Sequence, residues 1–478
     1  MESFGHVIGG EEVESRDGAT FESVDPWERT GWATVALGSP ADADRAVTAA
    51  RAAFDNGPWP RLSLAERGRI LHRLADLVEA NAVELATADT TDMGKPIRET
   101  LGHDVPRAAQ NLRFFADHST VTAAESFPMA TGHHAYTQYD PAGVVAAIVP
   151  WNFPLMMATW KVAPALAWGN TVVLKPAEQS PASATLLARL ALDAGLPPGV
   201  LNVVHGYGPG SVGQALTESP QVDRITFTGE TTTGRAISRA AAENLTPVSL
   251  ELGGKGANIV FDDCDIDRAV HWSIRAIFSN SGQVCLAGSR LYVQRGVLDT
   301  FLRRFTEAAE RLVIGNPKER STELGPLSSE EHFRKVAGYL DVAAAEGARV
   351  HTGGIGDGWT IRPTIVVGAG QRARITQEEV FGPVVVVLPF DDEQEAVAAA
   401  NDTPYGLNAM LFTRDLSRAH RVSRALRVGT VWTNCFFVRD LRAPFGGAKN
   451  SGVGREGGVF SRDFFTEPKA VVMEIADA

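Results

Sequence analysis

The stretch from residue 143 to residue 175 reads GVVAAIVPWNFPLMMATWKVAPALAWGNTVVLK. Its first apolar run, 144–149, and its last, 171–175, have the length and composition of buried strands. The segment between them, 154–167, is long enough for a helix that crosses from one strand to the next, and such crossovers connect parallel strands. This stretch therefore predicts an α/β fold.

The same alternation continues downstream. It predicts a helix at 180–194, a strand at 201–204, a helix at 210–217, a strand at 224–227 and a helix from residue 233. A second series follows the glycine pair 253–254, with a strand at 257–260, a helix at 267–278, a strand at 289–294 and a helix at 297–311. Short buried strands that alternate with helices are typical of doubly wound parallel sheets, so we expect two such domains.

The flanking segments differ from these two series. The first 120 residues are predicted to be mostly helical, and apolar positions within 64–80 recur at the spacing that buries one helix face. Residues 123–141 are polar and alternate in character, which predicts an exposed hairpin. The C-terminal segment 469–475 is predicted to form one more strand, which could join this hairpin at a subunit interface.

Composition and charge argue against several classes of protein. The chain has 478 residues with a net charge of −12, which repels polyphosphates and anionic membrane surfaces, so neither nucleic acid nor a membrane is an expected partner. Its start has no basic region followed by an apolar one, and the apolar stretch after Pro150 is interrupted by Asn, Pro and Lys. Three cysteines without a CxxC pair, and no clustered histidines, leave little for a disulfide framework or a metal site. We expect a cytoplasmic protein without a bound metal.

Three side chains of different chemistry indicate a catalytic site. Cys285 lies between a predicted helix and a predicted strand, where a loop could present its sulfur in a cleft, although a lone cysteine is more often a small buried apolar residue. Asn152 follows the strand 144–149 at the end where α/β sheets bind ligands, and its amide can donate to an oxyanion. Glu251 lies in an apolar strand, where burial raises the pKa of a carboxyl and favours a general base; a structural ion pair is the alternative.

A turn that contains two glycines follows the strand 224–227. The sequence there is FTGETTTG, and Gly229 would let the backbone approach a pyrophosphate at the start of a helix. The spacing departs from GxGxxG, so on its own the turn is a weak indication of a dinucleotide site.

Eight segments, in order, resemble motifs of the aldehyde dehydrogenase family, and the resemblance covers essentially the whole chain. They are PWNFP (150–154), WKVAPAL (160–166), KPAEQSP (175–181), the GxTxxG turn (229–234), LELGGK (250–255), GQVC (282–285), EEVFGP (378–383) and PFGGAKNSGVGRE (444–456). The resemblance implies two doubly wound domains with a β-hairpin for oligomerisation, and an enzyme that oxidises an aldehyde to an acid with NAD. A silent relative that only binds NAD or packs is the alternative from another class.

The resemblance also implies a division of labour among the three catalytic candidates. Cys285 is expected to attack the aldehyde, while the Asn152 amide and the Cys285 backbone N–H hold the resulting oxyanion. Glu251 is expected to activate the water that hydrolyses the thioester. Since a silent relative needs none of the three, their joint presence favours an active enzyme. Glu456 matches a family glutamate for which a proton relay and a structural role are both open.

The resemblance further assigns cofactor-binding positions. Lys175 and Glu178 match residues that hold the adenosine ribose, and an acidic side chain there favours NAD over NADP. Glu379 and Phe381 match residues beside the nicotinamide ribose, Gly229 and Gly234 frame the pyrophosphate, and Glu230 stands where many members have serine. The predicted cofactor-binding residues are Trp151, Lys175, Glu178, Gly229, Gly234, Glu379 and Phe381.

Arginines near the expected aldehyde pocket indicate the substrate. Arg107 matches a channel position that is usually apolar in the family, and Arg439 precedes the PFGG segment on the other side, with Arg442 close by. Two converging guanidinium groups favour a carboxylated aldehyde, since an arginine binds a carboxylate with two hydrogen bonds. A surface arginine, or a pair with Asp440, is the alternative.

FTGETTTG, VRDLR and SGVGREGG together resemble the subgroup that acts on 2-hydroxymuconate, 2-aminomuconate and 5-carboxymethyl-2-hydroxymuconate semialdehydes. A broad, aliphatic or betaine-aldehyde specificity is the main alternative, although arginines disfavour a cationic substrate.

Domain boundaries follow from the same reasoning. We expect an NAD-binding domain at 1–122 and 142–252, a catalytic domain at 253–459, and an oligomerisation element formed by 123–141 and 460–478. The resemblance implies a homodimer or homotetramer.

Overall fold

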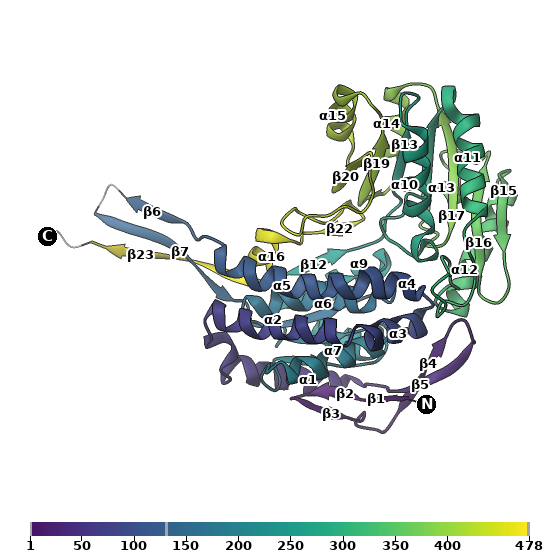
Figure 1. Ribbon diagram of the computed structural model, residues 1–478. Helices are drawn as coiled ribbons and strands as arrows, with labels where there is room; N and C mark the ends of the chain where they lie inside the picture. Colours follow the sequence, from purple (N-terminus) through teal and green to yellow (C-terminus); the bar gives the residue numbers. More distant parts are fainter. Residues whose placement is uncertain (1, 130–131, 476–478) are drawn as a thin grey trace.

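The structure is a computed structural model that describes residues 2–129 and 132–475. The predicted NAD-binding domain includes residue 1, and the predicted oligomerisation element includes residues 130–131 and 476–478. These residues lie outside the described ranges. Two large twisted sheets, each covered by helices, form the body, and a narrow three-stranded sheet projects from it (Figure 1).

The first large sheet has eight strands, and its centre is parallel as predicted. In spatial order they are β22 (Gly452–Val453), β12 (Val248–Glu251), β11 (Arg224–Thr228), β8 (Val144–Ile148), β9 (Thr171–Lys175), β10 (Leu201–Val203), β2 (His6–Ile8) and β3 (Glu11–Val13). The chain runs outward from β8 through β9 and β10, then returns to β11 and β12 on the other side of β8. The strand order therefore reverses between β8 and β11, and open α/β sheets bind ligands at such a switch point.

Helices cover both faces of this sheet because its strands are apolar on both faces. Val145 and Ala147 of β8 pack in one core cluster, and Val144, Ala146 and Ile148 pack in another. The first cluster includes side chains from α2 (Leu64–Ala80), α5 (Val105–Val121), α6 (Pro154–Ala167) and α7 (Ala182–Asp193), and the second from α1 (Pro40–Asp55), α8 (Val212–Glu218) and α9 (Thr231–Glu243). The predicted bounds of α2 and α6 match the structure.

The prediction that the first 120 residues are mostly helical is wrong for the N-terminal segment. Residues 2–36 form β1 (Glu2–Phe4), β2, β3, β4 (Thr20–Asp25) and β5 (Thr30–Ala36). β2 pairs with β10, which lies almost 200 residues downstream, and β1, β5 and β4 form a separate sheet. Such short strands owe their hydrogen bonds to distant partners, so local periodicity does not reveal them.

The second large sheet has seven strands and confirms the second doubly wound series. In spatial order they are β15 (Arg349–Ile355), β16 (Ile361–Val367), β17 (Val384–Phe390), β14 (Arg290–Gln294), β13 (Ala257–Val260), β19 (Asn408–Phe412) and β20 (Thr430–Thr433). All neighbouring pairs are parallel except β15 with β16. α10 (Ile266–Phe278) and α11 (Leu298–Glu310) pack on one face, and α12 (Glu330–Ala345), α13 (Arg374–Gln377), α14 (Glu393–Asn401) and α15 (Leu416–Ala425) pack on the other.

The projecting sheet contains the predicted hairpin. It consists of β6 (Ser126–Met129), β7 (His133–Pro141) and β23 (Thr466–Glu474), and β23 pairs with β7 along its whole length, from Thr466 opposite Pro141 to Glu474 opposite His133 (Figure 1). The C-terminal strand thus joins the hairpin within one chain. Apolar side chains are exposed on it, namely Phe127, Met129, Val472 and Met473.

Short elements complete the chain. They are η1 (Trp59–Arg61), α3 (Ala82–Met93), α4 (Ile97–Glu99), η2 (Thr100–Asp104), η3 (Ser279–Gly282), η4 (Arg295–Val297), β18 (Tyr405–Gly406), β21 (Ala448–Lys449) and α16 (Gly458–Phe465). Within the described ranges, none of the helices has both the length and the apolar character needed to cross a bilayer.

Candidate active site

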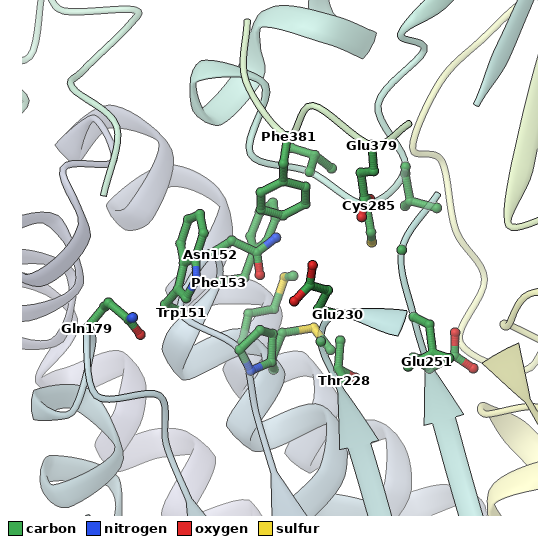
Figure 2. A pocket seen from close by; sticks show the side chains of 18 of the residues that line it. Trp151, Asn152, Phe153, Gln179, Thr228, Glu230, Glu251, Cys285, Glu379 and Phe381 are labelled. Atoms are coloured by element: carbon green, nitrogen blue, oxygen red, sulfur yellow. The ribbon is translucent and has the colours of Figure 1, made fainter. Parts of the chain in front are cut away.

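A cavity of about 370 Å³ lies between the two large sheets, at the carboxyl ends of β8, β11 and β12 and beside the loops that precede β14 and β17 (Figure 2). We call it the central cavity. Its wall includes all three catalytic candidates, Asn152, Glu251 and Cys285. Trp151, Glu178, Glu230, Glu379 and Phe381 form what we call the Phe381 end, and Met157, Trp160, Phe437, Arg439 and Phe445 form the Arg439 end.

Asn152 lies in the turn between β8 and α6, and hydrogen bonds fix its position. Its side-chain amide donates to the carbonyl oxygen of Gln283 at 2.8 Å, and its own backbone carbonyl accepts from the Asn280 amide at 2.9 Å. One N–H of the Asn152 amide is thereby used, which orients the amide plane and leaves the second N–H for an oxygen in the cavity.

Cys285 follows a strained turn that holds its loop against other parts of the chain. Asn280 and Ser281 both have φ near +50°, and Gly282 has φ of 73°. A Cβ added to Gly282 would lie only 2.1 Å from the carbonyl oxygen of Gly382, so the two backbones pack in direct contact. Strain of this kind persists only where the surroundings impose it, and here it presents the sulfur to the cavity.

The electrostatics of Cys285 keep its thiol protonated in the free chain. Burial, together with the nearby carboxyl groups of Glu379 and Glu251 and against an opposing effect of Arg439, raises the pKa of the thiol to about 12. Attack by the sulfur therefore requires a base that takes the proton.

Glu251 ends β12 and is a buried carboxyl without a partner. Its side chain is 3 % exposed, and neither oxygen has a hydrogen-bond partner among the described residues. Burial raises the pKa of this carboxyl well above its usual range, and the charge of Glu456 adds to the effect. A Cβ on Gly446 would lie 2.6 Å from one carboxyl oxygen, so the glycine makes room for it. An unpaired buried carboxyl of raised pKa is suited to a general base, and Glu251 forms no ion pair with any residue in the described ranges.

Glu456, by contrast, is saturated with hydrogen bonds. It accepts from the Trp160 indole at 2.5 Å, from the Ser249 hydroxyl at 3.1 Å and from the Thr226 hydroxyl at 3.3 Å, and it pairs with the buried Lys161. It does not line the central cavity. These contacts support the structural alternative for Glu456, because it ties α6 to β11 and β12.

The Phe381 end carries aromatic rings and carboxylates. The Trp151 and Phe381 rings pack edge to face at 5.4 Å. The Glu379 carboxyl accepts from the Gly254 N–H at 2.8 Å and lies against Gly253, and burial raises its pKa to about 7. Glu178 and Gly229 also line the wall.

Two predicted cofactor positions lie behind this wall. Lys175 is buried, its ammonium group donates to the Pro176 carbonyl at 2.9 Å, and it lies 3.9 Å from the Glu178 carboxylate. Gly234 lies inside α9, where a Cβ would meet Leu252 at 2.5 Å. The missing side chain of Gly234 thus lets α9 approach β12.

The N-terminus of α9 lies beside the Phe381 end without a side-chain cap. Glu230 is the N-cap residue and makes no capping hydrogen bond, and its carboxylate is 3.9 Å from the Lys335 ammonium group. The first backbone amides of this 13-residue helix are therefore not capped by a side chain. The start of such a helix can bind an anion through these backbone N–H groups.

The two arginines of the VRDLR segment have different environments. The Arg439 guanidinium lies between the Trp160 and Phe445 rings, at 4.6 and 3.9 Å from their centroids, and its buried Nη2 has no hydrogen-bond partner among the described residues. Burial and, to a smaller extent, the charge of Arg107 lower the pKa of Arg439 to about 10. Arg442 is exposed and pairs with Asp440 at 2.6 Å. The surface alternative therefore holds for Arg442, and Arg439 faces the cavity.

Arg107 lies on α5, close enough to Arg439 to lower its pKa, but it is not part of the cavity wall. It has neither an ion pair nor a hydrogen bond to any described side chain, and burial lowers its own pKa.

Several wall residues were not predicted from the sequence. Phe153, Met156, Met157 and Trp160 line the cavity from one side of the first two turns of α6, and their i, i+3, i+4, i+7 spacing was the available signal. Gln179 and His332 also line it, and no local pattern indicated them. Within residues 2–129 and 132–475, no group of three His, Cys, Asp or Glu side chains is arranged to hold a metal ion.

Comparisons with known proteins agree with this geometry. The model of the aldehyde dehydrogenase family matches residues 13–471. A 2-hydroxymuconic semialdehyde dehydrogenase of Pseudomonas sp. (strain CF600) is 49 % identical over 488 residues, covering 99 % of this chain and 100 % of that protein. A 2-aminomuconic 6-semialdehyde dehydrogenase of Pseudomonas sp. is 44 % identical over 487 residues, covering 99 % of each chain.

A solved structure leads to the same conclusion. The structure of an indole-3-acetaldehyde dehydrogenase in complex with NAD⁺ superposes with a TM-score of 0.97 at 44 % identity, covering 99 % of this chain and 97 % of the other. These matches confirm the predicted fold class and the predicted kind of enzyme. The chain belongs to the aldehyde dehydrogenase family.

Proposed function

We propose that this enzyme oxidises a carboxylated semialdehyde of the muconate type to the corresponding acid, with NAD as hydride acceptor. The observation that carries the substrate class is the Arg439 guanidinium, which lines the central cavity and forms no ion pair with a described residue. Relatives named for different aldehydes are equally similar, at 44 % identity for both 2-aminomuconic 6-semialdehyde and indole-3-acetaldehyde. Overall identity therefore does not select the substrate, and the residues that line the cavity indicate it.

A guanidinium with a buried nitrogen that has no acceptor is unfavourable, so the environment of Arg439 indicates a ligand. The two flanking rings stabilise the cation but satisfy none of its N–H groups. Nη2 of Arg439 is left without an acceptor, and such a group costs about 1–3 kcal/mol. A carboxylate would supply two acceptors in the plane of the guanidinium. A cationic aldehyde would be repelled by the same group.

The position of Arg107 also supports a carboxylated substrate. Its charge acts on Arg439, and two nearby like charges are tolerated best when an anion lies between or beside them. Among the residues that the structure describes, Arg107 has no acidic partner, whereas Arg442, three residues after Arg439, pairs with Asp440. We infer that Arg439 contacts the substrate carboxylate directly and that Arg107 adds charge from behind the wall.

The Phe381 end fits a dinucleotide. The uncapped start of α9 can receive a pyrophosphate, with Gly229 leaving the approach free of a side chain. The Glu178 and Glu379 carboxylates can accept from ribose hydroxyl groups, and the Trp151 and Phe381 rings offer apolar surface for the nicotinamide. When bound, NAD supplies the acceptor for the hydride that leaves the aldehyde carbon.

The chain itself supplies the remaining chemistry. The Cys285 sulfur bonds to the aldehyde carbon as its proton passes to water, so the Glu251 carboxylate stays ionised for the later hydrolytic step. The second N–H of the Asn152 amide and the Cys285 backbone N–H hold the oxygen that becomes negative. After oxidation the carbon is a thioester on Cys285. Glu251 then takes a proton from water, the hydroxide adds to the thioester, and the C–S bond breaks to release the acid.

The test compares Arg439→Gln with Arg442→Gln, a matched surface arginine from the same segment. We measure kcat/KM for 2-hydroxymuconate semialdehyde and for a neutral aliphatic aldehyde. Arg439→Gln is expected to lower kcat/KM about 100-fold for the carboxylated substrate, because two charge-assisted hydrogen bonds are lost, and to change it less than about 3-fold for the neutral one. Arg442→Gln should change neither. Equal losses for both aldehydes would remove the case for a carboxylate.

The division into domains and the assembly are also proposals. We infer an NAD-binding domain at 1–122 and 142–252, a catalytic domain at 253–459 and an oligomerisation element at 123–141 and 460–478. The exposed apolar side chains on the projecting sheet support a homodimer or homotetramer. The free thiols of all three cysteines support a reducing, cytoplasmic location.

A further inference from the structure

His332 connects three separate parts of the chain at the Phe381 end. It lies in the first turn of α12, and its ring packs edge to face on Trp151 at 5.1 Å and on Phe381 at 5.8 Å. Trp151 follows β8 of the first large sheet, and Phe381 precedes β17 of the second. With the contact between Trp151 and Phe381, the three rings form a closed triangle across the cleft between the sheets.

Phe381 needs an external restraint. Its φ is +61°, a left-handed conformation that a bulky residue adopts only when other contacts stabilise it. The Phe381 carbonyl oxygen accepts a hydrogen bond at 2.7 Å from Nε2 of His332. Because a carbonyl only accepts, Nε2 carries the proton, and burial lowers the pKa of His332 to about 4. The imidazole is thus a neutral donor at neutral pH.

The position of His332 is itself fixed. The Ser329 hydroxyl caps α12 by accepting from the His332 backbone N–H at 3.2 Å. The preceding residue, Ser328, donates its backbone N–H to the Gln283 side chain at 3.0 Å, and the Gln283 carbonyl accepts from Asn152. His332 is therefore tied to the same loop that presents Cys285.

We propose that His332 is a positioning residue for the cofactor. Its Nε2–H group donates to the Phe381 carbonyl and its ring packs on the Phe381 ring. Together these two contacts fix the orientation in which Phe381 contacts the nicotinamide end of the dinucleotide. The inference rests on the proposed use of NAD and names a residue that acts through Phe381. It separates two contributions, a hydrogen bond and a ring contact, which different substitutions remove.

The experiment measures NAD binding to the full-length enzyme by calorimetry, in the absence of aldehyde, for three variants. His332→Phe keeps a ring and removes the donor. His332→Gln places an amide N–H at a distance from the backbone similar to that of Nε2 and removes the ring. His420→Phe is the control, since His420 is exposed on α15 at a distance from the cavity. Thermal unfolding of each variant checks that it folds.

The hydrogen bond is expected to matter most. His332→Phe should raise the Kd for NAD about 10-fold, because the Phe381 carbonyl loses its donor, and His332→Gln should stay within about 3-fold of the wild type. The KM for aldehyde at saturating NAD should not change, since Arg439 and the α6 side chains are untouched. Because the pKa of Glu379 lies at about 7, NAD affinity can change between about pH 6 and 8, but the change should be the same in the wild type and in His332→Gln, as expected for a neutral imidazole.

Two results would overturn the inference. The first is a His332→Phe enzyme that binds NAD as tightly as the wild type. The second is an NAD affinity that rises, as the pH falls through the ordinary range of histidine, in the wild type but not in His332→Gln, since His332 would then act as a cation toward the phosphates. Failure of the wild type itself to bind NAD would refute the proposed cofactor, which is a separate outcome.

Discussion

The two ends of the central cavity have opposite electrostatic character. Four carboxylates line the Phe381 end and its rim, those of Glu178, Glu230, Glu331 and Glu379, with Lys335 as a cation among them. At the Arg439 end the wall is apolar and aromatic, and the charge comes from Arg439 with Arg107 behind it. Both ends open on the same three side chains, Asn152, Glu251 and Cys285.

This difference indicates how one cavity can keep two ligands apart. Carboxylates accept hydrogen bonds from hydroxyl groups, so the Phe381 end suits ribose and repels a free carboxylate. A guanidinium only donates, so the Arg439 end suits a carboxylate. A carboxylated aldehyde can thus enter in one orientation, with its carboxylate away from the dinucleotide and its aldehyde carbon toward Cys285.

Cys285→Ala tests whether each end of the cavity binds its ligand independently of the reaction at Cys285. Of the variants described here, it should have the largest effect on turnover. Without the sulfur no covalent intermediate forms, and turnover should fall by at least about 10³-fold. The Kd values for NAD and for a carboxylated product should stay within about 3-fold, since neither end is altered. Steady-state NADH formation and calorimetry measure the two quantities. Cys435→Ala is the control, and normal turnover by Cys285→Ala would refute the nucleophile.

Glu251→Gln should have the next largest effect. The variant should still release about one equivalent of NADH in a burst and then turn over about 10²–10³-fold more slowly, because hydrolysis of the thioester loses its base. Rapid-mixing absorbance separates the two phases. Glu243→Gln, an exposed carboxylate on α9, is the control. Loss of the burst together with the steady state would place Glu251 in an earlier step.

The pH profile of the wild type follows from the same residue. The active form of Glu251 is the carboxylate, and burial raises its pKa, so kcat should decline as the pH falls through a value above the ordinary range of glutamate. Glu251→Gln should lack this acid limb. A wild-type kcat that stays constant down to the ordinary pKa of glutamate would contradict the assignment.

Glu178→Gln should have the smallest effect, and this effect should be limited to the cofactor that binds at the Phe381 end. Removing this carboxylate weakens the repulsion of a 2′-phosphate, so the preference for NAD over NADP should shrink about 10-fold. The ratio of kcat/KM for the two cofactors measures it, and KM for the carboxylated aldehyde should not move. Glu331→Gln is a matched acidic neighbour on the same wall. An equal change in that variant would show that the overall negative charge of the wall sets the preference for NAD over NADP, and that a contact between Glu178 and the ribose does not.

Residues near in sequence show where prediction from sequence reaches its limit. Elements whose apolar pattern is local, such as α2, α6 and β9, were predicted with their observed bounds. The N-terminal strands were missed, because β2 becomes a strand by pairing with β10. Asn152 and Glu251 were expected at the carboxyl ends of strands and Cys285 in a loop before a strand, and the resemblance to the family implied that they meet. The structure places all three on one cavity.

The sequence by itself determined the alternation of strands and helices, the motifs that place the chain in its family, and the side chains available for chemistry at the strand ends. Only the tertiary structure decided that Arg439 faces the cavity between Trp160 and Phe445 while Arg442 lies on the surface, and that His332 holds Phe381. The physical reason is range: hydrophobic periodicity acts between neighbours in the chain, whereas burial and hydrogen-bond partners depend on segments more than a hundred residues away that meet only when the two sheets face each other.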